Sequence, residues 1–375
     1  SQYHLGSIHI LGDYVNPNVN KSIRYFMLSS DQNNLKAQLS LGDIFYKNEF
    51  IERDIEKAIH YFTLASNQND SLAQYYIGKI YFEGKYIKRD IEKALHYLQL
   101  ASNQNNVSAQ YFLGSIYLKG DIIERNMKKS IHYFELAANQ NHSDAQCMLG
   151  AIYSKGKYID VDIEKAIDYF TLASNNDNYY SQFLLGELYF YGEKVKKDIN
   201  KGIHYLTLSS NNGDYEAQHL LGMIYNEGIY VKRDINKSIE LLTLSANQNF
   251  PQAQYCLGEI YFDRNDINKT IHYLKLAADQ GHLYAQCYLG KLYLENDASK
   301  NVSQSIHYLE LASNQNCANA QNFLGQLYYN GKHIEKDINK SIHYLTLAAN
   351  NNNKDAQRTL GIVYFEGIYV KQDIK

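Results

Sequence analysis

Residues 71–105 read SLAQYYIGKIYFEGKYIKRDIEKALHYLQLASNQN, and this stretch decides the fold. Its first half, from Ala73 onward, places apolar residues at spacings of three and four, which is one face of an α-helix. Gly84 follows this helix, and glycine ends helices readily because it adopts positive φ without a Cβ clash. A second amphipathic stripe begins after Asp90. The stretch therefore predicts a helix-turn-helix unit, whose helices we name helix A and helix B.

The unit recurs along the whole chain, and an Ala-Gln or Ser-Gln dipeptide marks each copy. The glutamines are Gln2, Gln38, Gln74, Gln110, Gln146, Gln182, Gln218, Gln254, Gln286, Gln321 and Gln357. Such a period predicts an all-α fold, a right-handed α/α superhelical solenoid of repeats of about 36 residues. We expect a single array over residues 1–375, with ten full helix pairs and a final lone helix A. Because no polar caps close its ends, we expect it to be a segment of a longer chain.

Two further columns, each made of residues at the same position in successive repeats, support the same helix-turn-helix repeat. Helix B begins with Asp or Asn, whose side-chain oxygen accepts from the first-turn N–H groups and contributes about 1 kcal/mol. These residues are Asn18, Asp54, Asp90, Asn126, Asp162, Asp198, Asp234, Asp266, Asn301, Asp337 and Asp373. Helix A contains Gly6, Gly42, Gly78, Gly114, Gly150, Gly186, Gly222, Gly258, Gly290, Gly325 and Gly361. Each glycine costs about 1 kcal/mol relative to alanine, so we expect close helix packing at this column.

These residues resemble the Sel-one-like repeat (SLR), a relative of the tetratricopeptide repeat. The family pattern is roughly A-x-A-Q-x-x-L-G-x-x-Y-x-x-G-x-x-V-x-x-D-x-x-K-A-x-x-W-Y-x-x-A-A. Residues 73–84, AQYYIGKIYFEG, and then Asp90 follow it, and the match extends over the entire chain. Tyrosine replaces the tryptophan of the pattern in helix B, as at Tyr61, Tyr97 and Tyr133. We expect this replacement to leave the fold unchanged.

The resemblance implies a role in binding. Members of the family serve as adaptors and assembly scaffolds, which implies protein partners without catalysis and identifies none of them. Secreted members carry paired cysteines, whereas this chain has Cys147, Cys256, Cys287 and Cys317, at least 30 residues apart. We therefore expect a reducing, cytoplasmic compartment. A secreted or ER-luminal location stays open because the sequence begins without Met.

Composition narrows the possible partners. The chain has 37 Lys and Arg against 40 Asp and Glu, a net charge of -3, and no long basic run, which argues against nucleic acid. No apolar stretch approaches the roughly 20 residues of a membrane-spanning helix, so no membrane insertion is predicted. The oligomeric state stays open.

Catalytic motifs are not found in the sequence. Seven histidines share a helix B column: His60, His96, His132, His204, His272, His307 and His343. Consecutive members lie one repeat apart, about 10 Å by helix packing, which is too far to share a metal at about 2 Å per bond. We interpret them as a partly exposed structural column. With no zinc-protease, P-loop, hydrolase or EF-hand motif present, the chain is predicted not to be an enzyme, with no catalytic, cofactor or metal site.

Helix A carries a second stripe opposite its buried face. At about 100° per residue from Ala73, the buried set centres near 10°, whereas Tyr75, Lys79 and Phe82 fall near 200°, 240° and 180°. Helix A usually lines the concave side of such solenoids, and aromatic clusters with few charges are typical of binding surfaces. The predicted protein-binding stripe is Tyr75, Lys79, Phe82, Tyr111, Leu118, Phe183, Glu187, Phe190, His219, Met223, Tyr255, Glu259 and Phe262. The alternative is that neighbouring rings pack on one another along the groove.

The function predicted from these features is a non-enzymatic scaffold or adaptor that binds a peptide, a helix or a protein surface in the groove. One alternative is a structural element of a larger assembly, bound through the convex face or the loops. Another is a regulatory or targeting segment of a multidomain enzyme. Groove substitutions would abolish partner binding only in the first case.

Overall fold

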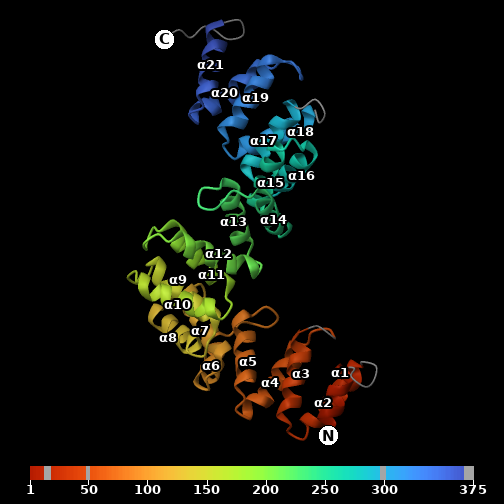
Figure 1. The fold of residues 1–375 in the computed structure, drawn as a ribbon. Coiled ribbons are helices and arrows are strands. Elements are labelled where there is room, and N and C mark those ends of the chain that lie inside the picture. Colours follow the sequence, from red (N-terminus) through yellow and green to blue (C-terminus); the bar gives the residue numbers. More distant parts are fainter. Residues whose placement is uncertain (12–17, 48–50, 296–300, 367–375) are drawn as a thin grey trace. The chain divides into compact units, whose positions relative to one another are not determined.

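The structure is a computed structural model that describes residues 1–11, 18–47, 51–295 and 301–366. Over these ranges it contains 21 α-helices. The chain divides into two compact units, Ser1–Ser181 and Gln182–Lys375. In each unit, helices A and B alternate along the chain as successive pairs (Figure 1). The all-α helix-turn-helix solenoid predicted from the repeat is confirmed.

The helices have nearly uniform length. Helices A are α1 (Gln2–Leu11), α3 (Leu35–Lys47), α5 (Ser71–Glu83), α7 (Val107–Lys119), α9 (Ser143–Lys155), α11 (Tyr179–Tyr191), α13 (Tyr215–Glu227), α15 (Pro251–Asp263), α17 (Leu283–Glu295), α19 (Ala318–Asn330) and α21 (Lys354–Glu366). Helices B are α2 (Val19–Ser30), α4 (Ile55–Asn67), α6 (Ile91–Asn103), α8 (Met127–Ala138), α10 (Ile163–Asn175), α12 (Ile199–Asn211), α14 (Ile235–Asn247), α16 (Ile267–Asp279), α18 (Val302–Asn314) and α20 (Ile338–Asn350).

The predicted caps begin helices B. Asp54, for example, accepts a hydrogen bond from the backbone N–H of Lys57 at 3.0 Å, and Asn126 accepts one from Lys129 at 3.0 Å. All ten described members of the column make this bond. Asp373 lies outside the described residues.

The helix A glycines lie where helix B packs most closely. A Cβ at Gly114 would lie 2.7 Å from the Phe134 ring, and a Cβ at Gly186 would lie 2.7 Å from Leu206 Cγ. Phe134 and Leu206 are fully buried. Ten of the eleven glycines have a helix B side chain this close, whereas a Cβ at Gly361 would meet no described atom within 4 Å. The close packing expected from the glycine column is therefore confirmed.

The repeat glutamine forms a buried polar link between helix A and the end of helix B. Gln74 Oε1 accepts from Gln104 Nε2 at 2.7 Å, and Gln110 accepts in the same way from Gln140 at 2.7 Å. Asn212 donates to Gln182 at 3.0 Å in the second unit. Because a buried amide without partners is costly, these bonds fix the end of each helix B against its own helix A.

Asparagine supplies the turn that follows most helices B. Asn69, Asn105 and Asn249 have φ near +60°, a left-handed conformation in which asparagine is better tolerated than most other residues. Gly213 and Gly281 take this place in two repeats, with φ of 90° and 86°. Some of the many asparagines of the chain thus recur at one position of the repeat, where they adopt the left-handed conformation that the turn requires.

Candidate interaction groove

The predicted stripe lies on five helices A, two of them in the first unit. Tyr75, Lys79 and Phe82 lie on α5, and Tyr111 and Leu118 lie on α7. In the second unit, the stripe residues are Phe183, Glu187 and Phe190 on α11, His219 and Met223 on α13, and Tyr255, Glu259 and Phe262 on α15.

In the first unit the stripe rings pack against the next repeat. The Phe112 ring lies edge-on to Tyr75 at 6.3 Å and to Phe82 at 5.4 Å, centroid to centroid. Tyr111 stacks on His142 at 4.7 Å, and Leu118 is half-buried. Lys79 forms an ion pair with Glu83 at 3.9 Å. The alternative of ring packing between neighbouring repeats therefore describes these residues well.

Two stripe residues of the second unit are less exposed than the stripe geometry suggests. Phe183 retains 8% of its side-chain exposure and Phe190 retains 6%. Both pack in a core cluster with Ala217 and Leu221 of α13. The helical stripe places them away from their own helix B, but the following helix A covers them.

The remaining stripe residues of this unit, except Tyr255, line two cavities. The first, of about 430 Å³, is bounded by α11, α13, the loop residue Tyr230 and Phe250, which precedes α15. Its lining is Phe183, Glu187, Phe190, Tyr191, Glu216, His219, Leu220, Met223, Ile224, Glu227, Tyr230 and Phe250.

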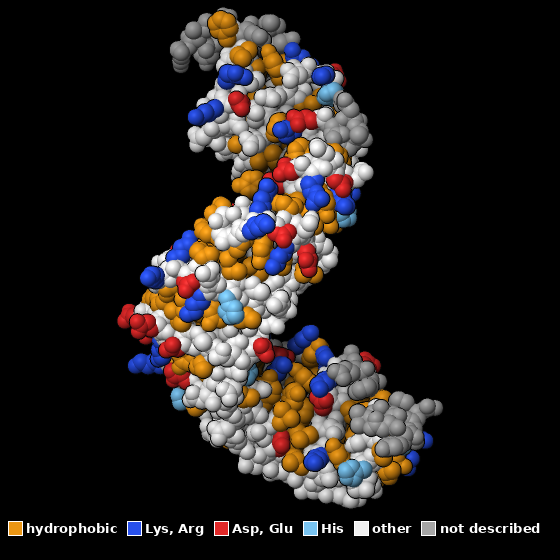
Figure 2. Space-filling model, in the orientation of Figure 1, with side chains coloured by type: hydrophobic (Ala, Val, Ile, Leu, Met, Phe, Trp, Pro, Cys, Tyr) orange, Lys and Arg blue, Asp and Glu red, His pale blue; other side chains and the backbone are white. Residues whose placement is uncertain are grey.

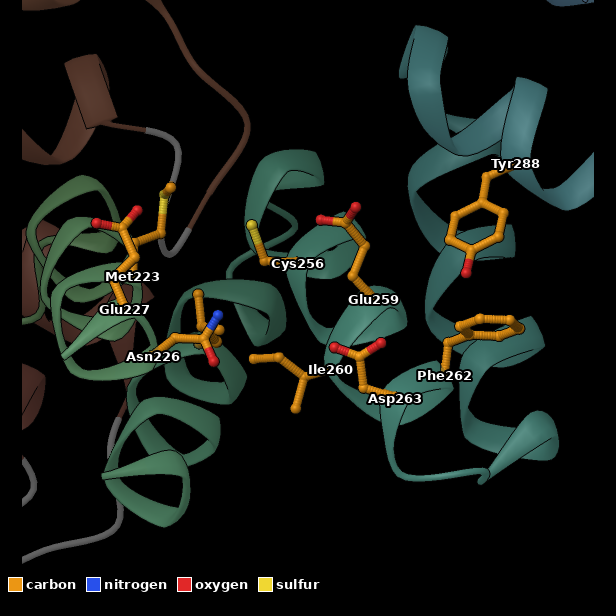
Figure 3. A pocket seen from close by; sticks show the side chains of 10 residues that line it. Met223, Asn226, Glu227, Cys256, Glu259, Ile260, Phe262, Asp263 and Tyr288 are labelled. Atoms are coloured by element: carbon orange, nitrogen blue, oxygen red, sulfur yellow. The ribbon is translucent and has the colours of Figure 1, made fainter. Parts of the chain in front are cut away.

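The second cavity, of about 440 Å³, lies between α13, α15 and α17. Its lining is Met223, Asn226, Glu227, Leu242, Cys256, Glu259, Ile260, Phe262, Asp263 and Tyr288. Figure 3 shows Glu227 and Met223 on one side, Glu259 and Asp263 in the middle, and Tyr288 beside Phe262. Met223 and Glu227 line both cavities, so the two adjoin. We name the two together the interaction groove.

The groove combines apolar and acidic side chains. Hydrophobic side chains also reach the surface among charged ones elsewhere in each unit (Figure 2), so apolar exposure alone does not distinguish this site. Its charged lining does: it consists of five carboxylates, Glu187, Glu216, Glu227, Glu259 and Asp263, with no Lys or Arg. Among the described residues, none of these five forms an ion pair.

Burial and nearby acids raise the pKa of two of these carboxyl groups, Glu187 and Glu216. Burial raises the pKa of Glu187, and the nearby Glu216, Glu193 and Asp214 raise it further. The pKa of Tyr288 is raised to about 12 by burial and by Glu259 and other acids. Both shifts follow mainly from burial, which disfavours the charged form, and secondarily from the neighbouring negative charges.

His219 contributes no positive charge to the groove at neutral pH. Burial lowers its pKa to about 4, and its Nε2 lies 3.7 Å from the Cys256 sulfur. Burial raises the pKa of the Cys256 thiol to about 12. A neutral imidazole beside a protonated thiol lacks the thiolate needed for nucleophilic chemistry, so this pair acts as part of the wall.

Several lining residues were missed by the helical stripe. They include Tyr191, Glu216, Glu227, Asp263 and Tyr288. Glu227 and Asp263 are the last residues of α13 and α15, four positions after Met223 and one after Phe262, the last predicted stripe residue of each helix. The sequence signal that could have revealed these two residues is the acidic residue that often ends helix A.

The histidine column packs as a structural column. Each imidazole lies 5.0–5.5 Å from the ring of the tyrosine that follows it, as in His60 and Tyr61. Over the described ranges, no three His, Cys, Asp or Glu side chains are grouped so as to hold a metal. No helix in the described part of the chain is long and apolar enough to cross a membrane.

Fold and groove together define an α-solenoid repeat protein, a class that generally mediates protein interactions. The family model of the Sel1 repeat matches eleven consecutive segments, so this chain belongs to the Sel1 repeat family. The segments are residues 1–34, 35–70, 71–106, 107–142, 143–178, 180–214, 216–250, 251–282, 283–317, 318–353 and 354–375. The family is typically non-catalytic, and the resemblance to the SLR pattern is confirmed.

Solved structures show the same fold. A protective antigen of uropathogenic Escherichia coli that displays an SLR fold is 24% identical, with a TM-score of 0.74 over 99% of this chain and 81% of its own. A Sel1 repeat protein from Oxalobacter formigenes is 23% identical, with a TM-score of 0.65 over 80% of this chain and 90% of its own. The comparison with curated proteins gives no significant match.

Proposed function

We propose that this chain is a non-enzymatic interaction scaffold whose second unit binds a segment of a partner protein in the interaction groove. The observation that carries the proposal is the adjoining pair of cavities, about 430 and 440 Å³, on successive helices A. Each is in the size range of ligand sites. Eight of the predicted stripe residues lie on the helices that bound them, and seven line the cavities: Phe183, Glu187, Phe190, His219, Met223, Glu259 and Phe262.

Met223 offers the sharpest test because it lines both cavities. Met223→Trp places a larger side chain in the wall that the two cavities share, without changing the charge. We therefore expect it to block the cavities and abolish capture of the partner from the native lysate. Phe183 and Phe190 are unsuitable for this purpose, since serine in their place would destabilise the core. Circular dichroism and thermal unfolding confirm that the variant is folded.

A second candidate function is side-on binding through helix B, as in a structural element of an assembly. A column of leucines on helices B supports it: Leu28, Leu172, Leu244 and Leu276 are each at least 40% exposed. Leu244→Asp tests this face within the same repeat as Met223. Partners lost only with Leu244→Asp would favour the helix B face, and equal recovery by both variants and the wild type would contradict both candidates.

A further inference from the structure

The charge of the interaction groove indicates which partner chemistry it fits. The carboxylates come from three successive elements: Glu187 on α11, Glu216 and Glu227 on α13, and Glu259 and Asp263 on α15. Glu259 accepts a hydrogen bond from Tyr255 Oη at 2.7 Å, which orients it without neutralising it. Acidic groups therefore border the groove along its length.

Three cations near this face contact lining residues or a neighbouring carboxylate but do not themselves line either cavity. Lys197 lies 5.0 Å from the Tyr230 ring centroid and 5.9 Å from that of Phe190. Arg233 donates from Nε to the Asn226 carbonyl at 2.8 Å. Lys291 on α17 forms an ion pair with Glu295 at 3.7 Å. None of these side chains belongs to the cavity lining.

Apolar side chains form the rest of the groove. Met223 lies in the wall between the two cavities, and Phe262 and Tyr288 pack edge to face at 5.4 Å at one end. Phe262 keeps 38% of its exposure. Such a surface is complementary to an apolar side chain in the middle and positive groups on either side, since complementary charge sets orientation and specificity.

We propose that the interaction groove binds an extended peptide segment in which Lys or Arg residues flank an apolar side chain. This rests on the function proposed above and names the chemistry of the partner. Neighbouring helices pack about 8–10 Å apart, and an extended chain advances about 3.3 Å per residue. The basic residues should therefore recur about every three positions, one for each helix A crossed.

The state of the carboxylates supports this partner. Glu187 is half-buried among other acids, and burial and repulsion raise its pKa, so its charge is unfavourable in the free protein. A bound ammonium or guanidinium group would relieve that repulsion. An acidic or uncharged peptide would bury these carboxylates without compensation.

The test begins with selection of a random peptide library, displayed on phage, against the whole chain. The most enriched peptide is then synthesised with a fluorescein group, and its affinity is measured by fluorescence anisotropy. The neutralised variant is Glu227→Gln, Glu259→Gln and Asp263→Asn combined, at three exposed positions. The matched control removes three exposed carboxylates of helices B: Glu92→Gln, Glu164→Gln and Glu240→Gln.

We expect enriched peptides with Lys or Arg about three positions apart around an apolar residue. Their affinity should fall about tenfold in the neutralised variant, weaken with added salt, and stay unchanged in the control. Enrichment of neutral or acidic peptides, or equal loss in both triple variants, would overturn the proposal. If the enriched peptides of either outcome still lose affinity in Met223→Trp, the groove remains the binding site, and only the proposal that the partner is basic is wrong. If Met223→Trp has no effect, or no peptide is enriched, the proposed function fails as well.

Discussion

The two units have the same pattern of buried residues in their repeats, but they differ in the charges on their helix A stripes. In the first unit, Asp43 pairs with Lys47 at 2.8 Å on α3, and Lys79 pairs with Glu83 at 3.9 Å on α5. In the second unit, the carboxylates of α11, α13 and α15 that line the groove form no ion pair with a described residue. Pairing returns on α17, where Lys291 contacts Glu295. Among the described stripe positions, the carboxylates without an ion pair are thus Glu187 and Glu259, both on helices that form the groove.

This difference shows that the residues that specify the fold are not those that we propose to specify binding. Apart from the terminal repeats, the alanine, glutamine and glycine columns of helix A are buried in both units, and they are nearly constant from repeat to repeat. Stripe positions vary, because packing within a repeat does not constrain them. In a solenoid each repeat contacts mainly its neighbours, so a local change of stripe charge creates a site without disturbing the array.

The largest expected effect tests the shared interior. Phe134→Ala in the first unit should lower the free energy of unfolding by about 3–5 kcal/mol, and Leu206→Ala in the second by about 2–5 kcal/mol. Both side chains are fully buried against a helix A glycine. Urea unfolding followed by circular dichroism measures these losses. Leu172→Ala, on an exposed leucine, serves as the control, and a loss no greater than in the control would show that one unit is packed differently.

The glycine column gives a smaller effect of the same kind. Gly114→Ala and Gly186→Ala each force a helix B side chain to move, at a cost of about 1–3 kcal/mol. Alanine also gains about 1 kcal/mol of helix propensity, which partly offsets this cost. Gly361→Ala brings the gain without a described clash.

The same unfolding measurements separate the two contributions. We expect Gly361→Ala to raise stability, and the Gly114 and Gly186 variants to fall about 1–3 kcal/mol below it. Stabilisation at all three sites would contradict close helix packing as the reason for the column.

The interior could be predicted from the sequence because its determinants are local and repeated. Helix caps such as Asp54 act on N–H groups within one turn, and the period reveals glycines such as Gly114 even in a single sequence. The structural role of Gln74 was harder to predict from the sequence. Its partner, Gln104, lies 30 residues away in a turn, and only the contact shows that the glutamine links helix A to the end of helix B.

The groove was predicted in part, for a physical reason. A helical stripe shows which residues face away from their own helix B, and Met223 and Glu259 of the stripe line the cavities. It contains no information about the next repeat, which covers Phe183 and Phe190 and contributes Tyr288. Cavity shape depends on side chains from successive helices A, and the binding role of the stripe stays a prediction.

The smallest expected effect has opposite signs in the two units. Asp43→Asn removes an ion pair between positions i and i+4 and should lower the free energy of unfolding by about 0.2–0.5 kcal/mol. Glu187→Gln removes a carboxylate that burial and neighbouring acids disfavour, so it should raise stability at pH 7. The gain should stay below about 1 kcal/mol because solvent screens this half-buried group.

The pH dependence fixes the origin of the Glu187 effect. Its pKa in the folded chain lies above the ordinary value of 4.5, so the native state binds this proton more tightly than the unfolded state. The carboxylate therefore costs stability above the folded-state pKa, and the cost fades as the pH falls towards 4.5. Urea unfolding of Glu187→Gln and wild type at pH 7 and near pH 4.5 should show the advantage of the variant shrinking. An advantage that is constant with pH, or the same sign for Asp43→Asn, would mean that the stripes of the two units do not differ in electrostatic strain.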